Sequence, residues 1–182
     1  METSIVDHRS EQIISPWVTL VTHSLRLPGW EKPEDYHSLK QADYVALFTV
    51  TTDGQIPLVR QYRSAVERYT LELPSGLLEA GEDPKETAVR ELHEETGFVA
   101  GPDLTLMGRL AADTGRLENY QWAFFTSRAT RGIGQSWVPE AQVESLLVTK
   151  EELNQLILNG KFNHSPHLAV IALAAIRGLF SF

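Results

Sequence analysis

The sequence of 182 residues contains no cysteine. A disulfide framework is therefore excluded, and so is a zinc site built from thiolate ligands. The histidines do not replace such a site, because none of them forms the H-x-x-x-H or H-E-x-x-H spacing of a histidine zinc site.

Positive charge is also scarce, with 16 Lys and Arg against 24 Asp and Glu and a net charge of −8. A protein that coats nucleic acid needs a basic excess to hold phosphates, so we expect no nucleic-acid partner.

Long hydrophobic runs are missing as well. The N-terminal METSIVDHRSEQ is too polar for a secretory signal, and the longest late apolar run, 168–176, is far shorter than the roughly 20 residues that span a bilayer. We therefore expect a soluble cytoplasmic protein without a membrane partner. With 42% hydrophobic residues, this length suits one compact domain with a short extra arm.

Strand patterns dominate what is present. Alternating or β-branched apolar residues predict strands at 17–27, 34–40, 44–51, 56–62, 69–73, 105–110, 121–126 and 143–148, with turns at Pro28-Gly29 and Asp53-Gly54. Helices are predicted after Asp83, after Thr149 up to Asn159-Gly160, and over 167–179. Mixed strands with few helices indicate an α+β sandwich.

The helix after Asp83 carries most of the chemical information. Asp83 can act as its N-cap and Gly97 as a left-handed C-terminal residue. Glu91, Glu94 and Glu95 lie at i, i+3 and i+4, so three carboxylates share one face and repel one another. A hard cation such as Mg²⁺ would relieve this repulsion, and the alternative is a solvated acidic face. We expect the carboxylates to point away from the packed face.

The segment as a whole resembles the signature of the Nudix hydrolase family, G-x5-E-x7-R-E-U-x-E-E-x-G-U, where U is apolar. The matching residues are Gly76, Glu82, Arg90, Glu91, Leu92, Glu94, Glu95, Gly97 and Phe98. Seven fixed identities would arise by chance on the order of 10⁻⁹ times per starting position. The resemblance implies a Nudix α/β/α sandwich with a mixed sheet, in an enzyme that hydrolyses a pyrophosphate bond.

Two further segments resemble the ADP-ribose pyrophosphatase branch of that family: VRQYR at 59–63 and LELPSGLLEAGE at 71–82. The resemblance implies that Arg63 contacts the substrate diphosphate, with Arg60 as a second candidate and Glu72 also within reach. A guanidinium suits this role because it recognises phosphate in a bidentate manner. The alternative for Arg63 is an ordinary surface arginine.

An N-terminal β arm is a further feature of that branch. The resemblance implies that residues 1–40 form an arm for dimerisation and base binding, ahead of a Nudix domain at 41–182. Trp17 and Tyr36 would stack on the base in a site shared by two subunits, so we expect a homodimer. Alternatively, both aromatics pack the arm against the core.

One departure concerns the loop DTGRLEN at 113–119. Many relatives carry a proline about sixteen residues after the signature, where this chain has Ala112 and Asp113. Nucleotide sugars such as GDP-mannose are therefore candidate substrates beside ADP-ribose. Arg116 and Asn119 could contact the substrate, or the loop could be solvated around a turn at Asp113.

The resemblance also implies the ligands of the cofactor, Mg²⁺, for which Mn²⁺ could substitute. Glu91 and Glu95 would hold it, together with Glu94 and the Ser75 carbonyl. Arg90 would orient the glutamates. The metal would neutralise the diphosphate and activate a water.

The catalytic base is implied to be a glutamate near the strand at 143–148. Glu140 and Glu144 are the candidates, and Glu140 is preferred because its loop could close over the site. Glu82 fits an auxiliary metal role.

The last predictions concern the places of three histidines and two competing functions. His93 is expected to face solvent, and His164 and His167 to cap or pack the last helix. Competing functions are a house-cleaning nucleoside triphosphate pyrophosphatase and a non-catalytic ADP-ribose-sensing domain.

Overall fold

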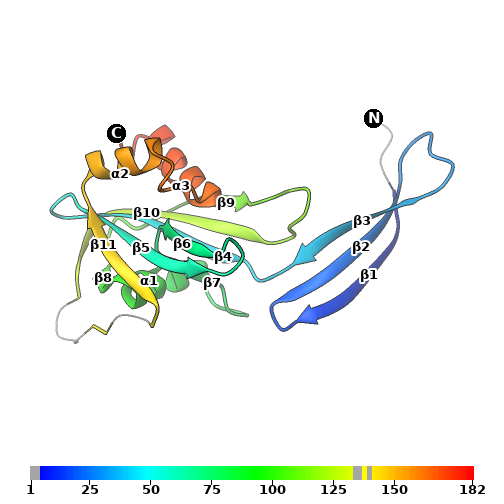
Figure 1. The fold of residues 1–182 in the computed structure, drawn as a ribbon, viewed down its shortest axis with the longest axis horizontal. Helices are drawn as coiled ribbons and strands as arrows, with labels where there is room; N and C mark the ends of the chain where they lie inside the picture. The colour runs from blue at the N-terminus through cyan, green and yellow to red at the C-terminus, as the bar shows by residue number, and fades with distance from the viewer. Residues whose placement is uncertain (1–4, 133–136, 139–140) are drawn as a thin grey trace. The chain divides into compact units, whose positions relative to one another are not determined.

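The computed structural model describes residues 5–132, 137–138 and 141–182. The chain forms two compact units, shown in Figure 1. Unit 1 contains Met1–Asp43 together with Ala111–Tyr120, and unit 2 contains Tyr44–Leu110 and Gln121–Phe182. The division of roles between an arm at 1–40 and a domain at 41–182 stays a prediction.

Unit 1 is an antiparallel sheet in the order β1 (Ile5–Ser15), β2 (Val18–Arg26) and β3 (Glu34–Lys40). The segment 111–120 is attached to β3 by two backbone hydrogen bonds, from Leu39 N–H to the Arg116 carbonyl and from Glu118 N–H to the Leu39 carbonyl. The sequence did not predict β1. Residues 8–14 of this strand are exposed, so pairing with β2 rather than burial holds it.

Unit 2 contains two sheets. One has the order β7-β4-β10-β8, with β9 also paired to β10, and the other has the order β11-β5-β6. Their strands are β4 (Tyr44–Thr51), β5 (Ile56–Arg63), β6 (Arg68–Glu72), β7 (Ser75–Leu77), β8 (Phe98–Val99), β9 (Thr105–Ala111), β10 (Tyr120–Arg131) and β11 (Val143–Val148). Because β4 runs parallel to β10 and antiparallel to β7, the sheet is mixed, as predicted.

Helices cover both sides of these strands. In Figure 1, α1 (Pro84–Thr96) lies on one side, and α2 (Lys150–Leu158) and α3 (Ser165–Ile176) lie on the other. This arrangement confirms the α/β/α sandwich. The predicted capping box of α2 is present, with Thr149 and Glu152 bonding reciprocally. The last helix begins two residues earlier and ends three residues earlier than predicted.

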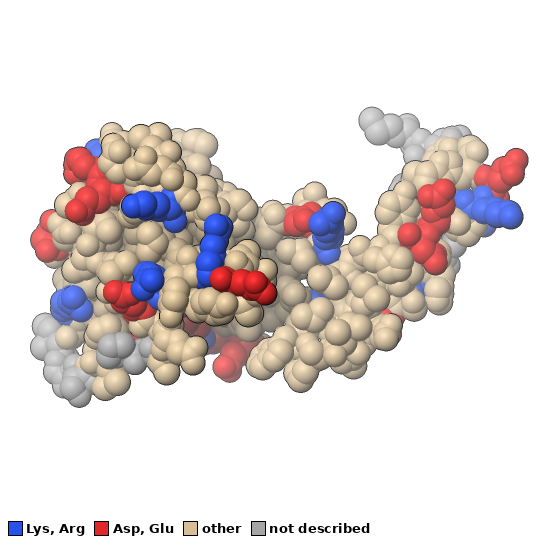
Figure 2. Space-filling model, in the orientation of Figure 1, with Lys and Arg blue, Asp and Glu red and all other residues tan. Residues whose placement is uncertain are grey.

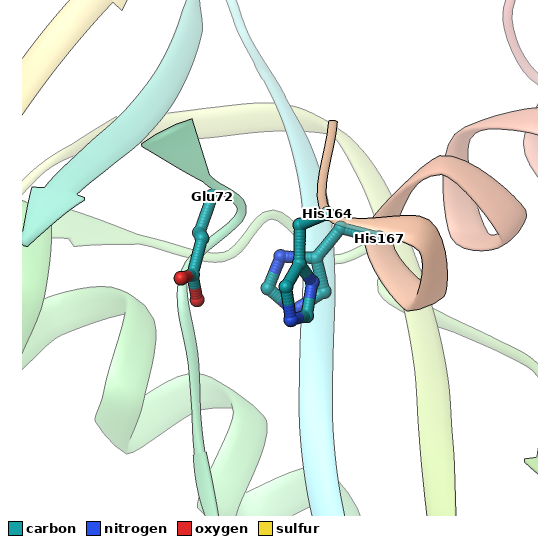
Figure 3. Close-up of side chains that lie close together, drawn as sticks. All are labelled: Glu72, His164 and His167. Atoms are coloured by element: carbon teal, nitrogen blue, oxygen red, sulfur yellow. The ribbon is translucent and has the colours of Figure 1, made fainter. Parts of the chain in front are cut away.

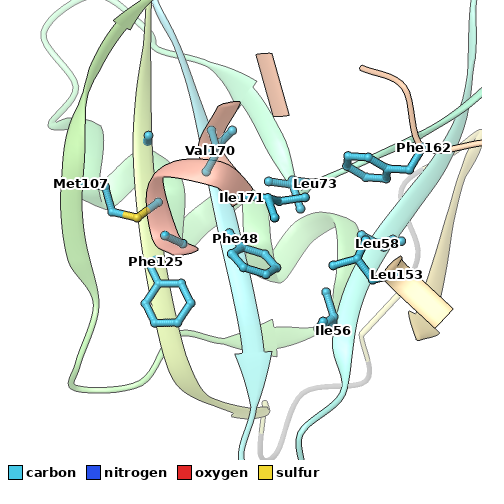
Figure 4. Packing of buried hydrophobic residues seen from close by; sticks show 13 residues of the cluster. Phe48, Ile56, Leu58, Leu73, Met107, Phe125, Leu153, Phe162, Val170 and Ile171 are labelled. Atoms are coloured by element: carbon cyan, nitrogen blue, oxygen red, sulfur yellow. The ribbon is translucent and has the colours of Figure 1, made fainter. Parts of the chain in front are cut away.

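The packing of the core explains why helices cover both faces of the sheet. Residues 45–49 of β4 are all buried, so this strand has apolar cover on both faces. Ala46 and Phe48 point into the larger cluster, which also receives Val170 and Ile171 from α3 (Figure 4). Val45 and Leu47 point into a second cluster with Ala88 and Leu92 of α1. The alternation of β4 therefore fixes α1 and α3 on opposite sides of the sheet.

The surface carries mixed charge. On the face drawn in Figure 2, Lys and Arg side chains lie among Asp and Glu side chains rather than in one continuous patch. Among the described residues, no helix is long and apolar enough to cross a membrane.

Candidate active site

The helix α1 is held in place at both ends. The Asp83 carboxylate accepts hydrogen bonds from the backbone N–H groups of Lys85 and Glu86, and Pro84 occupies the first turn. At the other end, Gly97 has φ 72° and donates its N–H to the His93 carbonyl at 2.8 Å. Both predicted caps are confirmed, so the carboxylates of α1 have a fixed frame.

Glu91 and Glu95 turn toward β7. Glu95 is 4% exposed, and its Oε2 accepts the backbone N–H of Ser75 at 2.9 Å. Glu91 lies against Gly76, where an added Cβ would fall 2.0 Å from Glu91 Cδ. The prediction that the carboxylates point away from the packed face is wrong for Glu95, because β7 covers that side of the helix. The two carboxylates therefore lie together against the β7 backbone.

Arg90 binds three carboxylates, one of which is Glu91. Its Nε donates to Glu82 at 3.1 Å, and its Nη1 donates to Glu91 at 2.8 Å and to Glu94 at 2.9 Å. The hydrogen bond with Glu82 is the main cause of the raised pKa of Arg90, and the same bond lowers the pKa of Glu82. Arg90 therefore joins three carboxylates, in keeping with its predicted orienting role.

A second ion pair lies in unit 2, between Arg63 at the end of β5 and Glu72 at the end of β6. Arg63 Nε donates to Glu72 Oε1 at 2.8 Å and Nη2 donates to Oε2 at 2.5 Å. Burial opposes ionisation of Glu72, but hydrogen bonds from Arg63 and Thr70 outweigh it and lower the pKa of that carboxyl to about 2. The hydrogen bond with Glu72 is the main cause of the raised pKa of Arg63, and charge attraction to Glu95 on α1 is a smaller one.

Two histidines from the start of α3 lie beside Glu72 (Figure 3). His167 is buried, as predicted, and its Nδ1 accepts the backbone N–H of Leu73 at 3.0 Å. Burial lowers the pKa of His167 to about 3 and also lowers the pKa of His164. Of the two roles predicted for His164, capping or packing, packing is the one present: its side chain makes no cap hydrogen bond, and its ring lies 4.0 Å from that of His167 between centroids.

His93 differs from its prediction too. It is half-buried rather than solvent-facing, and its Nδ1 is buried without a partner among the described residues. An added Cβ on Gly132 would lie 3.2 Å from its ring, so the end of β10 covers this histidine.

The two candidate bases have different surroundings. Glu144 is exposed on β11, and its Oε2 accepts from Arg60 Nη1 at 2.9 Å, while Arg60 also lies 4.2 Å above the Tyr69 ring. Glu140 lies outside the described residues. Trp137, which precedes it, donates its indole N–H to the Glu94 carbonyl at 3.0 Å. This contact could not be predicted from the sequence, because it joins residues 43 positions apart.

Unit 1 contains a pocket of about 660 Å³. Tyr36 and Arg116, both predicted to bind substrate, line it together with His23, His37 and Glu118. Glu118 accepts hydrogen bonds from Ser38 at 2.6 Å, from Arg9 at 2.9 Å and, through a ring nitrogen, from His23 at 3.0 Å. This cluster was not predicted, since its members come from four distant segments.

Other predicted contacts of unit 1 fall outside the lining of that pocket. Trp17 is 71% exposed in the turn between β1 and β2. Asn119 is buried, which rules out a fully solvated loop, although the predicted turn at Asp113 is present.

The chain is similar to known proteins in sequence and in fold. A family model described as NUDIX domain matches residues 40–169. ADP-ribose pyrophosphatase of Bacillus subtilis (strain 168) is 43% identical over 91 residues, which are 50% of this chain and 49% of that protein. ADP compounds hydrolase NudE of Escherichia coli (strain K12) is 31% identical over 107 residues, 58% of this chain and 53% of that protein. The chain thus spans about half the length of these curated relatives.

A solved structure shares the fold. It is described as an ADP compounds hydrolase and superposes with a TM-score of 0.78 at 21% identity, covering 96% of this chain and 94% of that chain. The family match extends well beyond the signature helix and includes the Arg63–Glu72 pair and the start of α3. The chain therefore belongs to the NUDIX domain family.

Proposed function

We propose that the protein hydrolyses the pyrophosphate bond of ADP-ribose or of another nucleotide sugar. The products are a nucleoside monophosphate and a sugar phosphate. One observation carries the proposal: the side chains of Glu91 and Glu95 lie against the β7 backbone, Glu91 at Gly76 and Glu95 at the N–H of Ser75. Relatives named ADP-ribose pyrophosphatase and ADP compounds hydrolase support the substrate class.

The donor set suits Mg²⁺, with Mn²⁺ as a substitute. Glu91, Glu95 and the Ser75 carbonyl would hold the ion, with Glu94 as a further ligand. All are oxygen donors, which hard cations prefer. The absence of a side chain at Gly76 leaves the space that Glu91 occupies. When bound, the metal supplies positive charge to the diphosphate and favours ionisation of a water molecule.

Arg63 binds the diphosphate in this proposal. Its Nε and Nη2 are directed toward Glu72, while its side chain is still 44% exposed and Nη1 has no partner among the described residues. A guanidinium has five N–H donors, so it can hold Glu72 and still donate to a phosphate oxygen. Glu72 fixes the guanidinium plane, which spares the substrate the cost of ordering it.

Glu140 is the proposed base that accepts the proton of the attacking water. The contact of the neighbouring Trp137 with the carbonyl of Glu94 supports a base from this segment. Glu144 is the second candidate, but its carboxylate is engaged by Arg60. Arg60 is thereby less available for substrate.

The nucleoside base is proposed to bind unit 1. Tyr36 offers an exposed ring and Arg116 a cation at the same pocket, and both suit an aromatic, phosphate-linked ligand. Trp17 would contribute from a second copy of the chain, since its side chain is exposed. We also propose that the protein is a homodimer and acts in the cytoplasm.

A substrate panel tests this function. Purified protein with Mg²⁺ is incubated with ADP-ribose, GDP-mannose, other nucleotide sugars and nucleoside triphosphates, and the products are separated by ion-exchange chromatography. The expected products from ADP-ribose are AMP and ribose 5-phosphate. Cleavage of triphosphates alone would indicate a house-cleaning enzyme, and tight ADP-ribose binding without turnover would indicate a sensor.

A further inference from the structure

The carboxylate of Glu72 and the rings of His164 and His167 lie together, with one ligand-type atom of each within 4.8 Å of the others (Figure 3). Two imidazoles and a carboxylate are a ligand set that Zn²⁺ accepts. The cluster therefore has the composition of a metal site outside the α1 carboxylates.

The hydrogen bonds of the cluster argue against a metal. Leu73 N–H donates to His167 Nδ1, so this nitrogen carries no proton and the neutral ring is protonated at Nε2. A ligating histidine does the opposite, since it binds metal through one nitrogen and donates a proton from the other. Glu72 is already held by Arg63 and Thr70. His167 is thus an acceptor for the backbone rather than a metal ligand.

We propose that His167 is a positioning residue for the catalytic segment 72–75, which it holds by accepting the backbone N–H of Leu73. The proposal rests on the proposed function, because it assigns His167 an effect on Arg63 and on the backbone of Ser75. His167 itself touches neither substrate nor metal.

Three hydrogen bonds fix the segment. Leu73 N–H is bound by His167, the Pro74 carbonyl accepts from Leu47 N–H at 3.0 Å, and Ser75 N–H donates to Glu95 at 2.9 Å. Glu72, which holds Arg63, is the first residue of this segment. The phosphate-binding arginine and the Ser75 carbonyl are therefore separated by a few residues whose position depends on His167.

The anchor itself is rigid. His167 and Leu73 are 1% and 0% exposed, so no water replaces the imidazole as an acceptor. Val170 and Ile171, in the next turn of α3, are packed in the larger core cluster and set the position of the ring. A buried N–H that loses its acceptor must move or stay unsatisfied, and either outcome is unfavourable. A displacement of about 1 Å in a positioning group can reduce a rate about 100-fold.

Two amides of different length separate this role from simple packing. In His167→Asn the amide oxygen lies near the position of Nδ1 and can accept from Leu73, whereas in His167→Gln it lies nearer to Nε2. We expect kcat for ADP-ribose at saturating Mg²⁺ to fall about 10–100-fold in H167Q. In H167N we expect it to stay within about 5-fold of wild type, with KM changing less than kcat.

Hydrogen exchange tests the contact between His167 and Leu73 without a measurement of activity. In metal-free protein, the backbone amides of Leu73, Ser75 and Gly76 should exchange faster in H167Q than in wild type, while those in H167N stay close to wild type. Thermal unfolding of each variant establishes that both are folded, and His167→Leu replaces H167Q if the latter does not fold. If the wild type cleaves no nucleotide sugar, the proposed function fails, and the exchange comparison still tests the anchor.

Two results would overturn the proposal. One is equal exchange and equal kcat in H167N and H167Q, since a packing role does not distinguish the two amides. The other is stoichiometric Zn²⁺ binding by wild type in equilibrium dialysis that is lost in H167N, because it would require the opposite tautomer.

Discussion

Arg63 and Glu72 form a two-point ion pair in which the carboxylate is fully buried and the guanidinium is half exposed. The pair joins the ends of β5 and β6 and directs the exposed side of Arg63 outward. A buried carboxylate thus orients a cation whose proposed role is to bind phosphate.

Replacing one partner of this pair should cost stability. Arg63→Met leaves the Glu72 carboxylate buried and unpaired, and we expect a loss of about 2–3 kcal/mol in unfolding free energy. This is less than the roughly 3–5 kcal/mol of a fully buried pair, because solvent reaches Arg63. Urea unfolding measures it. The double variant R63M/E72Q should regain part of the loss, and an R63M variant as stable as wild type would contradict a structural pair.

The free energy of unfolding should decrease over two pH ranges as the pH is lowered. The pKa of His167 is about 3, below its ordinary 6.5, so the unfolded chain binds the proton first and stability is lost as pH falls below about 6.5. The slope reaches about 1.4 kcal/mol per pH unit. The pKa of Glu72 is about 2, below its ordinary 4.5, so its contribution is present above pH 4.5 and is lost as pH falls toward 2.

The two windows are separable by variants in urea unfolding at successive pH values. H167N should flatten the dependence between pH 6.5 and 4.5, although His164, whose pKa is also lowered, keeps part of it. E72Q should lower stability by a constant amount above pH 4.5 and flatten the pH dependence below it. Identical slopes in wild type and H167N would show that His167 is not buried as a neutral ring.

Gly76→Ala should disable the site without unfolding the protein. Its Cβ would fall 2.0 Å from Glu91 Cδ and displace that carboxylate from β7. We expect activity to fall by about 100-fold, and we expect the apparent affinity for Mg²⁺ to weaken. Gly108→Ala is the matched control, since its Cβ would meet only Leu173 at 3.8 Å. Normal Mg²⁺ titration of G76A would disprove the role of Glu91.

The catalytic base can be identified by comparing Glu140→Gln with Glu144→Gln. Loss of a general base reduces kcat about 10²–10⁴-fold, and we expect this for E140Q. E144Q should stay within about 3-fold of wild type, because it removes only an exposed pair with Arg60. Stopped assays at saturating substrate compare the two. Small, equal losses would exclude both residues.

Much of the fold could be predicted because local patterns agreed with the tertiary structure. The strands at 34–40, 44–51 and 143–148 have the predicted bounds, and the caps at Asp83 and Gly97 fixed the carboxylate helix. Strand β1 was missed because its polar residues show no buried face. Strands β7 and β8, of three and two residues, are too short to carry a pattern.

The site was only partly predictable, since spacing along a helix does not reveal what packs against it. The i, i+3, i+4 pattern grouped Glu91, Glu94 and Glu95, but Glu95 is buried by β7 and Glu94 is half exposed. The contacts of His167 with Leu73 and of Glu118 with Ser38 join residues 94 and 80 positions apart. No local motif encodes such pairs.

The central claim, Mg²⁺-dependent hydrolysis by the α1 carboxylates, is tested most directly by Glu95→Gln. The amide keeps an acceptor for Ser75 N–H, so the fold should remain, while a ligand charge is lost. We predict that kcat/KM for ADP-ribose falls about 10³-fold or more and that the half-saturating Mg²⁺ concentration rises, with Glu86→Gln on the exposed first turn unaffected. ADP-ribose cleavage by E95Q at the wild-type rate, with the same Mg²⁺ dependence, would contradict the account.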